Sequence, residues 1–161
     1  MTYLKQLNDI VASIIKLPVI NEKISLLKRK LKQTDQAFVW SVIDAPLLSG
    51  MPGNIKSGWI FILKVGVPSG CHYHPNSIQH MILIEGGGKS NVGGNIKKMI
   101  TFGYPGYNVE DIWYVIEEGV EHEFFPEEQD MVVISFHTCV ADELQEVTCG
   151  TNKKRFYEKK L

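Results

Sequence analysis

Three histidines, His72, His74 and His122, are the residues of this sequence best suited to chemistry. His72 and His74 are separated by one residue, and because side chains alternate along a strand, both imidazoles would point to the same face. His122 comes much later, directly after the turn-forming residues 118–121. Three imidazoles on rigid strands are a ligand set for Zn, Fe, Mn, Ni or Cu. The spacing therefore predicts a divalent metal site, and ordinary packed or solvated histidines are the alternative.

The residues around the first two histidines resemble the first sequence motif of the cupin superfamily. The chain reads Gly66, five residues, His72-Tyr73-His74, four residues, Gln79, six residues, Gly86. This spacing is similar to the family motif throughout, and Gln79 stands where the family usually has glutamate.

The second cupin motif is also matched in part. Gly119 and His122 are separated by two residues, as in that motif, while Glu117 stands where the family usually has proline. The resemblance covers roughly residues 36–140 and does not extend to the N-terminal segment.

The resemblance implies an all-β fold, the cupin double-stranded β-helix or jelly-roll barrel, with a metal ion inside. Its ligands would be His72, His74, Gln79 and His122, and its cofactor one divalent transition metal ion: Fe, Mn, Ni or Zn. Glutamine is neutral, so these ligands would leave the charge of the ion uncompensated and favour an anionic or enolate-forming ligand. His80 is an alternative to Gln79, but strand alternation sends it to the opposite face.

Ser135 and His137 are weaker candidates. In the strand expected near residues 131–137, they share one face with Met131 and Val133. If that face lines the cavity, Ser135 and His137 become candidate catalytic residues, as acid–base or orienting groups. A surface position for His137 at the strand end is the alternative.

The pattern from residue 36 onward is typical of an all-β sandwich or barrel. Short runs rich in β-branched and aromatic residues occur at 37–44, 59–65, 80–85, 97–102, 112–116 and 131–136. Clusters rich in turn-forming residues separate them at 49–53, 86–88, 93–95, 103–106 and 126–130. We therefore expect a barrel domain over residues 36–149, with Trp59 and Trp113 in its core or wall.

The two ends of the chain have a different character. Residues 1–35 carry two apolar stripes at helical spacing, separated by Pro18, and predict two short amphipathic helices. These stripes would pack either on the barrel or on a partner subunit, and a homodimer is the expected assembly. Residues 150–161 are basic and polar, which predicts a loosely held tail.

Composition sets limits on partners and location. The 161 residues carry a formal net charge of −1, which favours neither nucleic acid nor an anionic membrane as a partner. The three cysteines, Cys71, Cys139 and Cys149, are odd in number and lack C-x-x-C spacing, so reduced thiols are expected. With no apolar leader or membrane-spanning run, the sequence predicts a cytoplasmic protein.

Two classes of function fit these features. The first is a metal-dependent enzyme on a small chelating or anionic metabolite, either dioxygenase-like or a metal-assisted isomerase or lyase. The second is a non-catalytic cupin that binds or senses a small molecule through its metal. A purely structural metal is a third reading, and the fold alone does not separate them.

Overall fold

Two helices open the chain, as the sequence predicts. The computed structural model describes residues 2–157, with helix α1 at Tyr3–Ile14 and helix α2 at Pro18–Lys32. The Thr2 side chain accepts a hydrogen bond from the backbone N–H of Lys5 and so caps α1. Pro18 is the first residue of α2, where the missing N–H of proline leaves no hydrogen bond unmade.

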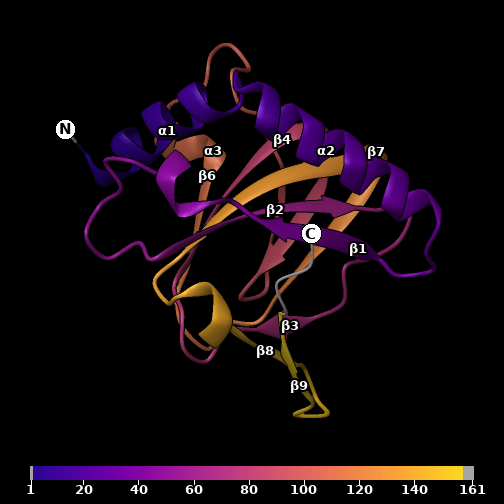
Figure 1. Cartoon of the computed structure of the whole chain (residues 1–161). Helices are drawn as coiled ribbons and strands as arrows, with labels where there is room; N and C mark the ends of the chain where they lie inside the picture. Colours follow the sequence, from indigo (N-terminus) through magenta and orange to yellow (C-terminus); the bar gives the residue numbers. More distant parts are fainter. Residues whose placement is uncertain (1, 158–161) are drawn as a thin grey trace.

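The rest of the described chain is mainly antiparallel sheet. The strands are β1 (Phe38–Val42), β2 (Ser57–Leu63), β3 (His72–Tyr73), β4 (Gln79–Val92), β5 (Asn95–Lys98), β6 (Trp113–Ile116), β7 (His122–His137), β8 (Gln145–Thr148) and β9 (Lys154–Phe156). Three short helical segments lie between strands: Ala45–Leu47, α3 (Val109–Ile112) and Ala141–Glu143. Strand β7 is central, because it pairs with β2, β3 and β4. The sheet curls around an interior, with α1 and α2 along one face and β3, β8 and β9 on the side away from them (Figure 1).

Strands β4 and β7 are longer than the sequence predicts. Residues 86–88 and 126–130 were expected as turns, but they lie inside these two strands, whose pairing shifts register between Leu83 and Gly88. Gly86 and Gly88 both have positive φ, and a Cβ on Gly88 would lie 2.0 Å from the carbonyl oxygen of Phe125. Glycine therefore permits a bulge here at which the paired strands bend and continue, so that the turn prediction was wrong.

The sheet has an apolar layer on each face because side chains alternate. Outward-facing Ile60, Ile62 and Ile134 pack with the buried residues of α1 and α2. The inward-facing residues of the same strands, such as Phe61 and Val133, form a second cluster inside the barrel. Both helical stripes are thus covered by the protein's own sheet and need no partner subunit. The homodimer stays a prediction.

The predicted core tryptophans are confirmed. Trp59 has 0% and Trp113 has 5% of its surface exposed. Trp59 belongs to the inner cluster, and Trp113 packs with the outer one.

The C-terminal segment is not a loose tail in the part that the structure describes. Strand β9 pairs with β8, β8 pairs with β3, and Tyr157 is buried in the inner cluster with 4% exposure. Burial of one large aromatic ring is enough to hold this segment against the barrel, although the residues around it are basic and polar. A prediction made from the average composition overlooks Tyr157. The remaining residues of that predicted tail, 158–161, lie outside the described part.

The prediction of reduced thiols is wrong for two of the three cysteines. Cys71 and Cys149 form a disulfide with a Cα–Cα distance of 5.5 Å, while Cys139 is free and buried. The pairing of His72 with Thr148 on β3 and β8 brings the two cysteines together. Disulfides persist mainly in oxidising compartments, so the cytoplasmic location stays a prediction that this bond does not support. None of the helices in the described residues is long and apolar enough to cross a membrane.

Candidate metal centre

The pairing of β3 with β7 brings the three predicted histidines together. His72 on β3 is the direct pairing partner of His122 at the start of β7, and His74 follows β3 by one residue. One nitrogen from each ring lies within 4.8 Å of the others, and all three residues are buried. The centroids of the His72 and His122 rings are 4.3 Å apart, and that of His74 lies 5.4 Å from each. The structure thus assembles the histidine cluster predicted from the sequence.

Backbone carbonyls orient all three rings in the same way. The Nδ1 atoms of His72, His74 and His122 lie 2.8, 2.6 and 2.9 Å from the carbonyl oxygens of Gly70, Gln145 and Val120, respectively. A carbonyl can only accept, so each Nδ1 carries the proton and each Nε2 keeps its lone pair. The Nε2 of His122 is buried without a hydrogen-bond partner. Protein metal ligands usually show this arrangement, and the residues present therefore fit a metal ion.

Burial keeps the imidazoles of His74 and His122 in their neutral, ligating form. The pKa of His74 is lowered to about 4, first by burial and then by the neighbouring His72. The pKa of His122 is lowered well below 6.5, again by burial first and by His72 and His74 next. Since a metal ion competes with protons for the same lone pairs, these neutral rings are prepared to bind one at neutral pH.

Gln79, at the start of β4, lines the same cavity as His72 and His74. Its amide nitrogen donates to the hydroxyl oxygen of Ser135 at 3.0 Å, while its amide oxygen is buried and has no hydrogen-bond partner. The alternative ligand, His80, is directed away from the cavity, since its ring is hydrogen-bonded to the Tyr3 hydroxyl of α1. The face assignment made from strand alternation therefore agrees with the structure.

Ser135 and His137 lie behind Gln79. Both are fully buried, so the alternative of a surface position for His137 is wrong. The two ring nitrogens of His137 are hydrogen-bonded to the hydroxyls of Ser77 and Ser135, and burial lowers its pKa well below 6.5. Neither Ser135 nor His137 is among the residues that line the cavity. Their predicted acid–base role stays a prediction.

The sequence analysis missed a group of residues from the C-terminal segment. Glu146 on β8 is 1% exposed, and one carboxylate oxygen lies 3.4 Å from Nδ1 of His72. The other oxygen pairs with Arg155 of β9. Burial by itself would raise the pKa of Glu146, but His72 and Arg155 outweigh it and hold that pKa below its usual value. No spacing pattern links Glu146 to the histidine motifs, so only the fold reveals it.

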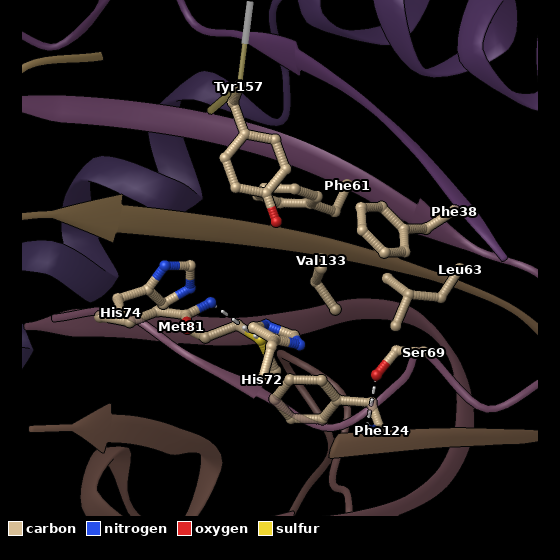
Figure 2. Close-up of a pocket in the computed structure, with 11 residues that line it drawn as sticks. Phe38, Phe61, Leu63, Ser69, His72, His74, Met81, Phe124, Val133 and Tyr157 are labelled. Atoms are coloured by element: carbon tan, nitrogen blue, oxygen red, sulfur yellow. Dashed lines mark hydrogen bonds between the residues drawn. The ribbon is translucent and has the colours of Figure 1, made fainter. Parts of the chain in front are cut away.

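A small cavity adjoins the histidines. Its lining residues are mainly apolar and aromatic: Phe38, Phe61, Leu63, Ser69, His72, His74, Gln79, Met81, Phe124, Val133 and Tyr157. Figure 2 shows Tyr157 over this space, with its hydroxyl oxygen pointing into it. Burial first, then the negative charge of Glu146 and a hydrogen bond with it, raise the pKa of Tyr157 well above 10. The cavity volume is about 30 Å³, room for about two waters.

A curled antiparallel sheet with a histidine cluster inside is the cupin fold, and the chain adopts it. Neither a family model nor a curated protein matches the sequence. Among solved structures, the salicylate 1,2-dioxygenase of Pseudoaminobacter salicylatoxidans with gentisate is 14% identical, with a TM-score of 0.60 over 81% of this chain and 36% of that one. The oxalate decarboxylase of Lactobacillus farciminis with formate is 13% identical, with a TM-score of 0.54 over 72% of this chain and 32% of that one. This chain therefore spans about a third of each.

Proposed function

We propose that this protein is a metal-dependent cupin that acts on a small carboxylate or enol. Its metal ligands would be His72, His74, Gln79 and His122. The observation that carries the proposal is the set of three buried imidazoles whose Nδ1 atoms are all engaged by backbone carbonyls, so that their Nε2 lone pairs remain for an ion. The ion would act there as a Lewis acid that polarises an oxygen of the substrate.

The charge of the site favours an anionic ligand. Three neutral imidazoles and one neutral amide do not compensate a divalent cation. Glu146 is near, but its carboxylate is paired with Arg155 and contacts only the far side of the His72 ring. A carboxylate or enolate would supply the missing negative charge. The aromatic walls of the cavity, such as Phe38 and Phe61, would exclude bulk water, and the volume of about 30 Å³ favours a small carboxylate or enolate.

The lining of the cavity favours chemistry performed at the metal. Among the described residues that line it, the titratable groups are two proposed ligands, His72 and His74, and Tyr157, whose hydroxyl is engaged by Glu146. An isomerase or lyase reaction needs a side chain that acts as acid or base, and the cavity offers few candidates for one. A dioxygenase-like reaction at the metal needs fewer such side chains, so the lining favours it. The same feature also favours the second candidate function, a non-catalytic cupin that binds a carboxylate through its metal.

The first experiment measures metal content. Protein purified without chelators is analysed for transition metals, together with the variants His72→Ala, His74→Ala and His122→Ala. We expect about one ion per chain in the wild type and near-complete loss in each variant, because each variant removes one of the three imidazole ligands. His80→Ala is the matched control, a buried histidine on the opposite face, and should keep its metal. Stoichiometric metal in His122→Ala would contradict the proposed site.

The second experiment separates the two functions. Gentisate and salicylate, the aromatic carboxylates named with the dioxygenase structures, and oxalate and formate, named with the decarboxylase, form the first panel. Calorimetry reports binding to the metal-loaded protein, while an oxygen electrode and carbon dioxide release report turnover. Binding with turnover supports an enzyme, and binding without turnover across the panel supports the non-catalytic cupin. Equal binding by the metal-free protein would contradict both.

A further inference from the structure

We infer that Ser77, His137 and Ser135 form a directed chain of hydrogen bonds that turns the amide oxygen of Gln79 toward the metal site. This inference rests on the metal site of the proposed function and assigns Ser135 and His137 a positioning role. Neither residue needs to touch the substrate.

The direction of the chain follows from its two ends. The Ser77 hydroxyl oxygen accepts from the backbone N–H of Thr138 at 3.1 Å, and its proton points to the carbonyl oxygen of Ile78 at 3.2 Å. With its proton on the Ile78 carbonyl, Ser77 accepts from His137, whose Nδ1 lies 2.9 Å away. Nδ1 of His137 therefore carries the hydrogen, and its Nε2 is left as an acceptor.

The other half of the chain continues in the same sense. The Ser135 hydroxyl donates to Nε2 of His137 at 3.1 Å, which leaves its oxygen to accept. The amide nitrogen of Gln79 then donates to that oxygen at 3.0 Å. Each member thus donates toward Ser77 and accepts from the side of Gln79. The amide oxygen of Gln79, a residue that lines the cavity, stays buried and without a hydrogen-bond partner.

An amide needs such orientation because its two ends differ chemically. The oxygen of glutamine has lone pairs for a cation, while its NH₂ group has only hydrogens to offer. A reversed Gln79 would place those hydrogens against the metal site and its oxygen against Ser135. A carboxylate has oxygen at both ends and would need no such selection. The chain is therefore a consequence of having Gln rather than Glu at position 79.

Histidine suits the middle of this chain because a neutral imidazole has a donor and an acceptor on opposite sides of one ring. The pairing of Gln79 with His137 across β4 and β7 places them side by side. His137 is completely buried, so water is not at hand to replace its bonds.

The test is a titration of metal-free protein with Co²⁺, followed by its visible absorption, which reports both affinity and ligand geometry. Ser135→Ala and His137→Phe each break the chain. We expect each to weaken Co²⁺ binding by about 10- to 100-fold, as changes to groups that orient metal ligands usually do, and to alter the spectrum. His80→Phe is the control, because it removes a buried histidine from the opposite face, and it should bind as the wild type does.

The same substitutions in a Gln79→Glu background distinguish orientation from general damage. We expect Ser135→Ala to weaken Co²⁺ binding by much less there, because a carboxylate presents oxygen in either orientation. Wild-type affinity of both chain variants in the Gln79 background would overturn the inference and leave the metal site standing. An equal loss in both backgrounds would overturn it too, since the damage would then be structural. Absence of Co²⁺ binding by the wild type would overturn the inference together with the proposed function. Ser135→Ala removes one atom only, and urea denaturation verifies its fold and that of His137→Phe.

Discussion

Lowering the pH should destabilise the metal-free protein strongly. His74 and His80 each have a pKa lowered to about 4 by burial, compared with 6.5 for an exposed histidine. Above pH 6.5 these residues are neutral in both the folded and the unfolded chain, and they contribute nothing to the pH dependence. As the pH falls from 6.5 toward 4, the unfolded chain takes up protons that the folded chain does not, so stability is lost.

The expected size follows from these two pKa values. For a histidine that titrates at 6.5 when unfolded and at about 4 when folded, the free energy of unfolding falls by about 2 kcal/mol between neutral pH and about pH 5. Two such residues give about 4 kcal/mol, a large share of the ~5–15 kcal/mol by which domains of this kind are stable. Burial also lowers the pKa values of His122 and His137 well below 6.5, so both residues add to the loss in the same direction.

Urea denaturation in the presence of a chelator, at about pH 7.5 and about pH 5, measures this difference. The variant His74→Gln has one titrating group fewer, so its pH difference should shrink by about 2 kcal/mol. Saturating metal should raise stability at the higher pH more than at the lower, because protons and metal compete for the same nitrogens. A metal-free protein equally stable at both pH values would refute the reasoning, since it would mean that the buried rings are not held neutral.

Three further predictions concern the parts that surround the site. Replacing Cys71 and Cys149 by serine should lower the free energy of unfolding by about 4 kcal/mol in urea denaturation, because the disulfide joins residues 78 positions apart; alkylation of both thiols in the untreated protein would contradict the bond itself. Tyr157→Ala should lower stability by about 3–5 kcal/mol and tighten binding of an aromatic carboxylate in calorimetry, because it empties space over the cavity; unchanged affinity would show that Tyr157 does not limit access. Deleting residues 1–34 should expose the apolar outer face of the sheet and cause aggregation in light scattering, and a soluble truncation of unchanged mass per particle would show that the helices are dispensable.

Local alternation along strands accounts for what the sequence predicts well. It puts His72 and His74 on one face, sends His80 to the other and groups Ser135 with His137 on a shared face, and each of these groupings depends only on period two. Alternation does not decide whether the face of Ser135 and His137 points inward. The helical stripes of residues 1–35 are equally local. These patterns survive folding because one face of each element is buried and register is therefore strongly specified.

The features that the sequence misses depend on contacts between distant segments. Gly86 and Gly88 look like turn residues, and only the close passage of β7 shows that they permit a bulge within a strand. Cys71 and Cys149 become neighbours through the pairing of β3 with β8. Tyr157 stands in a polar, basic stretch, and its burial follows from the docking of the C-terminal hairpin. None of these has a local signal.

The three histidines are oriented in two ways: His72 and His122 by carbonyls close to them in the sequence, and His74 by a distant carbonyl. The two ways should differ in how sensitive they are to substitution. Gly70 and Val120 contribute backbone carbonyls from within two residues of the histidines that they orient. A changed side chain at Val120 should therefore leave His122 in place, whereas Gly70 has a φ of +90° and a side chain there would strain the backbone that orients His72. His74 depends instead on the carbonyl of Gln145, far along the chain at the start of β8. The Asn76 side chain holds that region, through hydrogen bonds with Glu143 and Gln145.

The disulfide fixes the other end of the same strand. It ties the end of β8 to the residue before His72, so β8 is held at both ends beside β3. The C-terminal segment therefore does more than close the barrel: it orients His74, places Glu146 against His72 and carries Tyr157 to the cavity. The two cupin-like motifs supply the histidine nitrogens of the proposed metal site, but a segment outside both motifs determines how one of those nitrogens points. Substitutions in this segment would change the orientation of His74 and the shape of the cavity while leaving the histidines themselves unchanged. They would therefore alter which small molecule the same histidine cluster accepts.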